Sequence, residues 1–295
     1  MNSKTDFAIP VARTKAELRQ HIAEYRKNGK TVGFVPTMGA LHHGHISLVE
    51  IAQQRADCCI ASIFVNPTQF APGEDFDAYP RDSVADIQKL ADAGCRLVYL
   101  PDAKEMYPDG TRTDVRVEGL SDLLDGIYRP HFFYGVSTVV ARLFLHVQPD
   151  VAVFGEKDYQ QLQIIRRMVH DLGFPIEIVG GETRRDPDGL AQSSRNAYLT
   201  PEERINAGAL QAALYRGATR LSIGALPSEV IAEAIALLDS AGFRDINYIN
   251  LVDPDTLENL PDRPLASGQV ARLLGAAWMG KTRLIDNVSV VRESP

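Results

Sequence analysis

Short apolar segments alternate with amphipathic segments along the first part of the chain, up to about residue 180. The apolar segments are rich in β-branched residues, which predicts buried strands at 32–35, 58–65, 96–100, 151–154 and 176–179. The segments between them repeat apolar residues with the period of an α-helix, which predicts helices at about 45–56, 82–93, 136–147 and 159–172. This alternation predicts an α/β fold, a Rossmann-like doubly wound parallel sheet with helices on both faces.

The pattern changes after residue 183. Polar, turn-forming residues at 183–189 are suited to a hinge. Beyond them the periodicity predicts two helices and then three strands, at about 201–221, 228–241, 246–252, 269–277 and 283–291. Helices followed by strands predict a smaller α+β unit, so we expect one domain at 1–183 and a C-terminal α+β domain at 184–295. Before the first strand, the capping box Thr14-Lys-Ala-Glu17 predicts one more helix, which Gly29 can end.

The composition is that of a globular protein without a broad cationic surface. The chain has 295 residues, 45% hydrophobic content, a net charge of −7 and a pI near 5.5. An acidic chain is poorly suited to nucleic acid or an anionic membrane, so any bound phosphate has to be met by local cations. No apolar run is long enough to span a bilayer, and the N-terminus lacks a signal-peptide core. We therefore expect a cytoplasmic protein, and because the three cysteines have no disulfide or zinc spacing, we expect them to be buried thiols in a reducing compartment.

The most informative segment runs from Thr31 to His45, where an apolar strand passes through a glycine turn into a helix. A helix N-terminus after a strand offers unpaired N–H groups and a partial positive charge, which suit phosphate. His42 and His45 are three residues apart and could both face an anion there. Either histidine could equally be a helix cap or a surface residue. A metal site of His42, His43 and His45 is disfavoured, because no carboxylate or thiol lies at a ligand-like spacing nearby.

A second strand leads through a glycine into a helix at 150–161. Lys157 falls at the start of that helix, where its ammonium could neutralise a phosphate. The alternative is a solvated lysine flanked by Glu156 and Asp158, with Asp158 acting as a plain helix cap.

Two further groups of polar side chains are suited to a ligand. After the hinge, the hydroxyls of Ser193 and Ser194 precede Arg195, a combination that holds phosphate oxygens, although serine also dominates ordinary turns. After the second strand, Gln69 stands among apolar neighbours. Together with Gln161 it could hydrogen-bond a small acid without bringing like charge to it, and the alternative is that either amide caps a loop.

The segment Gly275–Thr282 matches the P-loop pattern G-x-x-x-x-G-K-[ST], but that motif binds phosphate only between a strand and a helix. The residues after it alternate like a strand. We therefore interpret the match as accidental and expect a strand, a turn and a final strand.

The histidine segment, Lys157 and Ser193–Asn196 together resemble the HIGH and KMSKS signatures of class I adenylate-forming nucleotidyltransferases. A larger set of segments resembles the pantothenate synthetase family, in order and across nearly the whole chain. The segments that carry this resemblance are 36–45, 64–70, 155–158 with Gln161, 188–196 and 280–287.

The resemblance implies that ATP drives the condensation of (R)-pantoate with β-alanine, giving pantothenate, AMP and pyrophosphate. His45 would be the catalytic histidine, and Gln69 and Gln161 would hold pantoate, with Gln69 also beside β-alanine. Magnesium (Mg2+) would accompany ATP, with Asp86 as a candidate near the metal, and the family's usual state is a homodimer. The residues implied to contact ATP are Met38, Gly39, Ala40, Leu41, His42, His43, Gly44, His45, Gly155, Glu156, Lys157, Asp158, Arg184, Gln192, Ser193, Ser194 and Arg195.

Three positions depart from the family pattern. Gln192 stands in place of a common methionine, Arg184 in place of an apolar residue near the adenine, and Tyr134 where arginine or aspartate is frequent. The first two concern the adenine contacts rather than the chemistry.

Our mechanistic hypothesis begins with attack of the pantoate carboxylate on the α-phosphorus of ATP, followed by attack of the β-alanine amine on the mixed anhydride. The expected catalytic residues are His42, His45, Lys157, Ser193, Ser194 and Arg195, acting mainly by positioning and electrostatics. The segment 184–196 would close over the anhydride. The alternatives are a nucleotidyltransferase that acts on a phosphorylated small molecule and a nucleotide-sensing regulator with a degenerate site.

Overall fold

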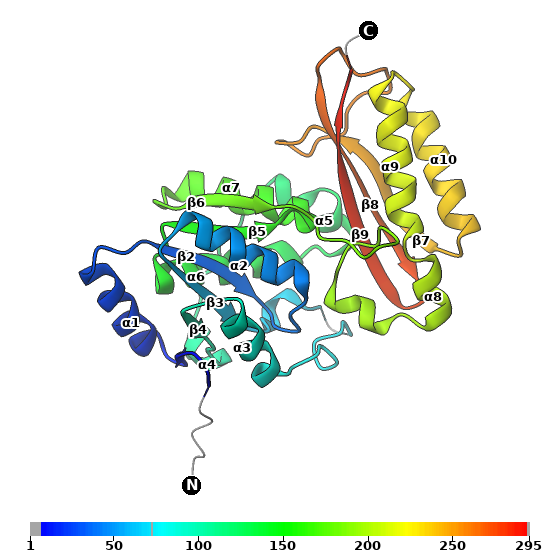
Figure 1. Ribbon diagram of the computed structural model, residues 1–295. Coiled ribbons are helices and arrows are strands. Elements are labelled where there is room, and N and C mark those ends of the chain that lie inside the picture. The colour runs from blue at the N-terminus through cyan, green and yellow to red at the C-terminus, as the bar shows by residue number, and fades with distance from the viewer. Residues whose placement is uncertain (1–6, 72, 294–295) are drawn as a thin grey trace. The chain divides into compact units, whose positions relative to one another are not determined.

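The computed structural model describes residues 7–71 and 73–293, which form two compact units (Figure 1). The first unit contains the chain up to Ser121 together with Arg129–Glu156 and Gln161–Glu182. The second contains Asp122–Tyr128, Lys157–Gln160 and the chain from Thr183 onward. The domain boundary between 183 and 184 stays a prediction. The N-terminal stretch judged to lack a signal-peptide core begins with residues 1–6, which lie outside the described residues.

A six-stranded, fully parallel sheet forms the centre of the first unit. Its strands are β1 (Val11–Ala12), β2 (Val32–Thr37), β3 (Cys58–Ile63), β4 (Leu97–Tyr99), β5 (Val151–Gly155) and β6 (Glu177–Gly181), in the order β1-β4-β3-β2-β5-β6. The structure confirms each predicted strand, with ends shifted by a few residues. Sequence reasoning missed β1, because two residues are too short to show a period; they pair with β4 at Val98 and Tyr99.

Helices cover both faces of this sheet, which confirms the doubly wound fold. They are α1 (Lys15–Lys27), α2 (His43–Arg55), α3 (Ser83–Asp92), α4 (Ala103–Met106), α6 (Phe132–Val147) and α7 (Tyr159–Leu172), with 3-10 turns η1 (Pro67–Gln69), η2 (Leu120–Asp122) and η3 (Glu156–Asp158). Alternate strand residues point to opposite faces. Phe34 and Ile60 pack in one core with α1, α6 and α7, while Val35 and Ala61 pack in another with α2 and α3.

The strand order reverses between β2 and β5. From β2 the chain adds β3 and then β4 on one side, and later adds β5 and β6 on the other side. In doubly wound sheets, ligands bind outside the carboxyl ends of the strands at such a switch point. The loops that follow β2 and β5 therefore occupy the place where this fold builds its binding site.

The second unit is an α+β arrangement around an antiparallel sheet, as expected. Its strands are β7 (Arg244–Val252), β8 (Val270–Met279) and β9 (Thr282–Val291), and its helices are α5 (Asp125–Tyr128), α8 (Pro201–Asn206), α9 (Ala209–Ser222) and α10 (Pro227–Ser240), with the 3-10 turn η4 (Ser194–Tyr198). Apolar residues of α9 and α10 pack on the sheet. The P-loop-like segment is a hairpin in which Met279 pairs with Thr282, so its interpretation as a strand, a turn and a strand is confirmed.

The predicted helix at 201–221 is wrong as a single element, because α8 ends at Asn206 and α9 begins at Ala209. Gly208 lies at the break. A Cβ atom at Gly208 would come within 2.7 Å of the backbone oxygen of Asp188. The close approach of a loop distant in sequence thus interrupts an otherwise continuous helical pattern.

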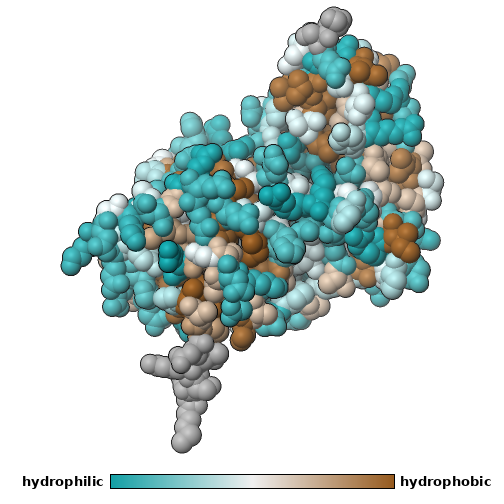
Figure 2. Space-filling model, viewed as in Figure 1, coloured by the Kyte–Doolittle hydropathy of each residue, from teal (hydrophilic) through white to brown (hydrophobic). Residues whose placement is uncertain are grey.

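The visible surface is mainly hydrophilic. Figure 2 shows hydrophilic residues over most of the visible face of each unit, with hydrophobic residues in small groups between them. Within the two described stretches, no helix combines the length and apolarity needed to cross a bilayer.

A buried histidine in the first unit makes its stability depend on pH. His146 of α6 is 9% exposed, and its Nδ1 lies 2.9 Å from the Tyr99 hydroxyl. Burial, with a smaller effect from Lys15, lowers the pKa of His146 to about 4. The unfolded chain takes up this proton near pH 6.5. The free energy of unfolding should therefore fall by about 2 kcal/mol between pH 7.5 and pH 5 because of this one group.

Urea denaturation of the parent and of His146→Gln at both pH values measures this effect. The pH dependence should be shallower in the variant, because glutamine does not titrate. Equal pH dependence in the two proteins would show that His146 does not resist protonation.

Candidate active site

The loop after β2 is held in an uncommon backbone conformation. Gly39 and Ala40 have φ angles of 85° and 51°, in the left-handed region that non-glycine residues rarely adopt. The N–H groups of Ala40 and Leu41 donate to the Asp86 carboxylate over 2.7 and 2.9 Å. This turn redirects the chain from the end of β2 to the start of α2.

His42 and His45 cap the N-terminus of α2. The Nδ1 atom of His42 accepts from the Gly44 N–H over 3.1 Å, and Nδ1 of His45 accepts from the His42 N–H over 3.3 Å. The ring centroids lie 4.1 Å apart. Because both Nδ1 atoms accept, the proton of each neutral ring is on Nε2. Capping thus uses Nδ1 of each ring and leaves the proton on Nε2, so capping does not by itself exclude anion binding.

Further predicted residues lie at the same edge of the sheet. β5 pairs with β2, so Gly155 at its end and Glu156 just after it flank the switch point together with the loop at 38–45. Gln69 ends the turn that follows β3, and Gln161 lies near the start of α7, after β5. The first unit therefore brings these predicted nucleotide and substrate residues to the carboxyl ends of neighbouring strands.

Gln69 is part of a buried polar network. Its exposure is 8%, and its Oε1 accepts from the Asn66 amide over 2.9 Å. The same amide donates to the Gly135 backbone oxygen, while the Tyr107 hydroxyl donates to the Asn66 side-chain oxygen. These bonds fix the position of the Gln69 side chain relative to the strand ends.

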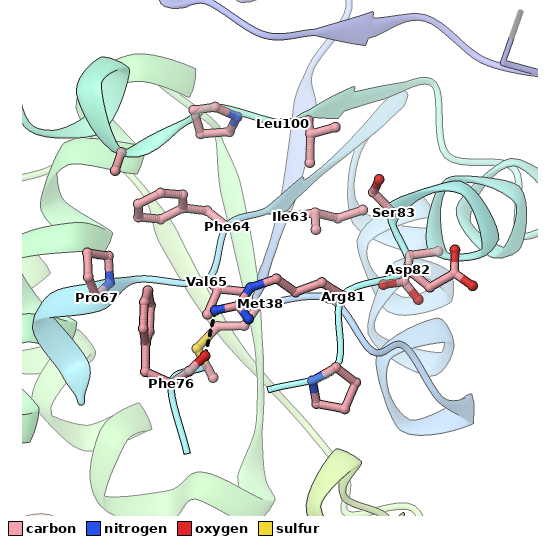
Figure 3. A pocket seen from close by; sticks show the side chains of 15 residues that line it. Met38, Ile63, Phe64, Val65, Pro67, Phe76, Arg81, Asp82, Ser83 and Leu100 are labelled. Atoms are coloured by element: carbon pink, nitrogen blue, oxygen red, sulfur yellow. Dashed lines mark hydrogen bonds between the residues drawn. The ribbon is translucent and has the colours of Figure 1, made fainter. Parts of the chain in front are cut away.

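A mainly apolar cavity of about 420 Å³ opens beside the loop at 38–45 (Figure 3). Met38, Ile63 and Phe64 line it at the ends of β2 and β3, and Leu100 lies just after β4. The Arg81 guanidinium donates to the backbone oxygen of Phe76 at the cavity wall. Gln69 and Gln161 are not among the residues that line it.

The predicted residues around Lys157 and at 184–195 belong to the second unit. Residues of β9 form hydrogen bonds to both of these segments. The side-chain amide of Asn287 donates to the Lys157 backbone oxygen over 3.0 Å. Asp286 accepts two bonds from the Arg185 guanidinium, over 2.6 and 2.9 Å. Asp286 and Asn287 are buried and consecutive on β9, so they fix Lys157 and the start of the hinge segment.

The segment 184–196, which includes most of the predicted hinge, folds back on itself. Arg185 and Ala191 form an isolated antiparallel bridge, and the Gln192 amide donates to the Asp186 carboxylate over 3.1 Å. The Ser193 hydroxyl oxygen accepts from the Arg195 N–H over 3.3 Å and caps η4. The Gln192 side chain is thus engaged within its own loop, while Arg184 is exposed.

Sequence reasoning assigned no role to Asp286 and Asn287, although the segment that contains them carried the resemblance. A signal was present, because two successive polar residues interrupt the apolar alternation of a strand. Buried polar residues at such a position need partners, and here the partners are residues of the predicted site.

The described residues do not form a binding site for a resident metal ion. Among residues 7–71 and 73–293, no three histidine, cysteine, aspartate or glutamate side chains gather in a way that could hold an ion. Both oxygens of Asp86 already accept backbone N–H groups. Asp86 therefore does not fit the role of a magnesium ligand.

Comparison with known proteins identifies the family. A family model described as pantoate–β-alanine ligase matches residues 10–289. A pantothenate synthetase from Hyphomonas neptunium is 65% identical over 293 residues, covering 99% of this chain and all of that protein. The crystal structure of pantothenate synthetase from Thermus thermophilus is similar with a TM-score of 0.89 at 48% identity, covering 95% of this chain and 99% of that one.

A further crystal structure, of pantoate–β-alanine ligase from Francisella tularensis, is described as a complex with β,γ-ATP and β-alanine. It has a TM-score of 0.78 and 33% identity, covering 95% of this chain and 97% of that one. Similarity of this extent spans the parallel sheet, the histidine-capped helix and the C-terminal strands alike. The chain accordingly belongs to the pantoate–β-alanine ligase family of ATP-dependent ligases, which condense pantoate with β-alanine.

Proposed function

We propose that the condensation begins at the switch point, next to the two histidines. A pantoate carboxylate oxygen attacks the α-phosphorus of ATP, the bond from that phosphorus to the bridging oxygen breaks, and pyrophosphate leaves. Charge grows on the phosphoryl oxygens, so fixed donors are worth most there. The Nε2–H groups of His42 and His45 would supply two such donors, and the observation that supports this role most directly is that both Nδ1 atoms accept backbone N–H groups.

Cations and hydroxyls expected from the sequence would bind the phosphates in this proposal. Lys157, whose side chain is 19% exposed, and Arg195 would meet the phosphates, with Ser193 and Ser194 as hydrogen-bonding partners. Gln192 and Arg184 would lie near the nucleotide. Domains at 1–183 and 184–295, with the second acting as a lid, are part of the same proposal.

In the second step the β-alanine amine attacks the carbonyl carbon of pantoyl-adenylate, and AMP leaves with the former carboxylate oxygen. Gln69 and Gln161 would hold pantoate through neutral amides, which bring no extra charge to its carboxylate. Gln69 would also contact β-alanine. The network through Asn66 supports this role, because it places the Gln69 amide before the substrate arrives.

Magnesium would enter with ATP, bound mainly to its phosphates, since the ion commonly uses few protein carboxylates. A homodimer and a cytoplasmic location complete the proposal. Three buried free cysteines favour a reducing compartment.

Pantoate-dependent exchange of labelled pyrophosphate into ATP tests the first step. We expect exchange without β-alanine, because the adenylate forms and reverses before the amine is needed. An enzyme that transfers AMP or CMP to a phosphorylated acceptor would show no dependence on pantoate. Absence of exchange in protein that binds ATP and makes pantothenate would exclude the adenylate route.

A further inference from the structure

We propose that Asp86 and Lys89 of α3 form a clamp that positions the loop at 38–45, and that Asp86 is not a ligand of magnesium. The clamp is defined as these two side chains together with the backbone groups of Ala40 and Leu41 that they bind. This inference deepens the proposed function, on which its effect on catalysis rests. Its structural part is independent of the reaction.

The Asp86 carboxylate is buried and fully directed at the loop. Its exposure is 2%, its Oδ2 accepts from the Ala40 N–H over 2.7 Å, and its Oδ1 accepts from the Leu41 N–H over 2.9 Å. Hydrogen bonds to an ionised acceptor are roughly twice as strong as neutral ones. Two of them on adjacent amides fix both the place and the orientation of this peptide.

The clamp holds a backbone conformation that the loop would otherwise avoid. Ala40 has a φ of 51°, and a left-handed conformation costs a non-glycine residue free energy. A Cβ atom at Gly39 would lie only 3.0 Å from Asp86 Oδ2, so the carboxylate fills the space that glycine leaves. Successive N–H groups in such a turn form a concave anion site, and here Asp86 is the anion.

Lys89 binds Leu41 at its backbone carbonyl. Its Nζ donates to the Leu41 backbone oxygen over 2.8 Å and lies 3.7 Å from Asp86 Oδ1. Leu41 is therefore held at both its N–H and its C=O by side chains one turn apart on α3. The next residue, His42, caps α2 and binds His45 through its backbone N–H, so the clamp sets where both imidazoles lie.

The surroundings of Asp86 oppose a cation. Magnesium requires oxygen ligands at about 2.0–2.1 Å in near-octahedral geometry. Here each oxygen faces the positive end of an N–H bond, and an ammonium lies 3.7 Å from one of them. Displacing these partners for an ion would release the turn that leads to His42.

Steady-state kinetics separates the two roles. Initial rates of Asp86→Asn and Asp86→Ala are measured against ATP at several concentrations of free magnesium, with pantoate and β-alanine saturating. For Asp86→Ala we expect kcat/KM for ATP to fall about 10- to 100-fold, with half-saturating free magnesium unchanged. Asp86→Asn should fall less, because its remaining oxygen still accepts one N–H. Recovery of full activity at high magnesium would instead make Asp86 a ligand and overturn the clamp.

Asp92→Asn is the matched control. It removes a carboxylate from the same helix, one that accepts a bond from the Gln88 amide at the surface, and its kinetics should equal those of the parent. Lys89→Met is the second variant and removes the donor to the Leu41 carbonyl while leaving the two N–H bonds to Asp86 in place. It should lower kcat/KM for ATP in the same direction as Asp86→Ala. Parent-like kinetics in both clamp variants would refute the proposal.

Hydrogen exchange of peptides that contain Ala40 and Leu41 provides a readout without catalysis. Exchange of these amides should be faster in Asp86→Ala and unchanged in Asp92→Asn. Faster hydrogen exchange in Asp86→Ala, together with a parent protein that shows no pantoate-dependent pyrophosphate exchange, would leave the clamp standing while the proposed reaction fails. Unchanged exchange would refute the clamp whatever the reaction is.

Discussion

Replacing His45 by alanine is expected to lower kcat for pantothenate formation by about 10²- to 10³-fold, the usual loss when one aligned donor to a developing oxyanion is removed. The imidazole caps α2 through Nδ1 and presents its proton on Nε2. Alanine removes both functions. Pantoate-dependent pyrophosphate exchange should fall in parallel, because we assign the donor to adenylate formation.

Two controls make this result specific. Gln54→Ala changes an exposed residue near the far end of α2 and should retain the parental rate. His45→Asn keeps a hydrogen-bonding side chain and should keep more activity than alanine. If His45→Ala made pantothenate at the parental rate with the parental KM for ATP, the catalytic role of this histidine would be wrong.

The histidine segment shows how far sequence reasoning reached. The strand, the glycine turn and the helix were predicted from local patterns, because β2, the turn and α2 follow one another directly along the chain. The helix was expected to begin near residue 45 but begins at His43. Imidazole caps are uncommon, so the sequence left capping and anion binding as alternatives where the geometry makes them compatible.

Long-range contacts set the limit of prediction elsewhere. Asp86 was connected with magnesium through family resemblance, whereas its partners Ala40 and Leu41 are 46 and 45 residues away in the chain. The break in the helix at 201–221 depends on a backbone oxygen of Asp188 near Gly208. Neither contact leaves a periodic signal, since each joins residues of different elements.

The same limit applies to the short segments that join the second unit. Residues 122–128 and 157–160 come from within the parallel α/β part of the sequence, yet they pack with the C-terminal strands. Asp125 is the anchor of the first segment: its Oδ1 accepts from the Tyr248 hydroxyl over 2.8 Å and from the Arg283 guanidinium over 2.6 Å. No pattern local to residue 125 indicates these partners.

Replacing Arg283 by methionine is expected to lower the free energy of unfolding of the second unit by about 3–5 kcal/mol. The side chains of Asp125 and Arg283 are only 9% and 13% exposed, so removing the cation leaves a carboxylate buried without its partner. The Tyr248 hydroxyl cannot replace the lost cation, because a tyrosine side chain is never positively charged; burial raises its pKa, so it stays a neutral donor. Urea denaturation, followed by the signal of the single tryptophan, Trp278 on β8, measures the loss.

Arg220→Met is the matched comparison, because this arginine pairs with Glu233 at the exposed surface of the same unit and should be replaceable without measurable loss. The double variant Asp125→Leu with Arg283→Met should be more stable than the sum of the two single losses predicts. Each single variant leaves one buried charge without its partner, whereas the double variant leaves none. A loss for Arg283→Met no larger than that for Arg220→Met would mean that the buried pair does not hold residues 122–128 to the C-terminal sheet. Apolar packing, and not the buried charge pair, would then be the reason why residues 122–128 belong to the second unit.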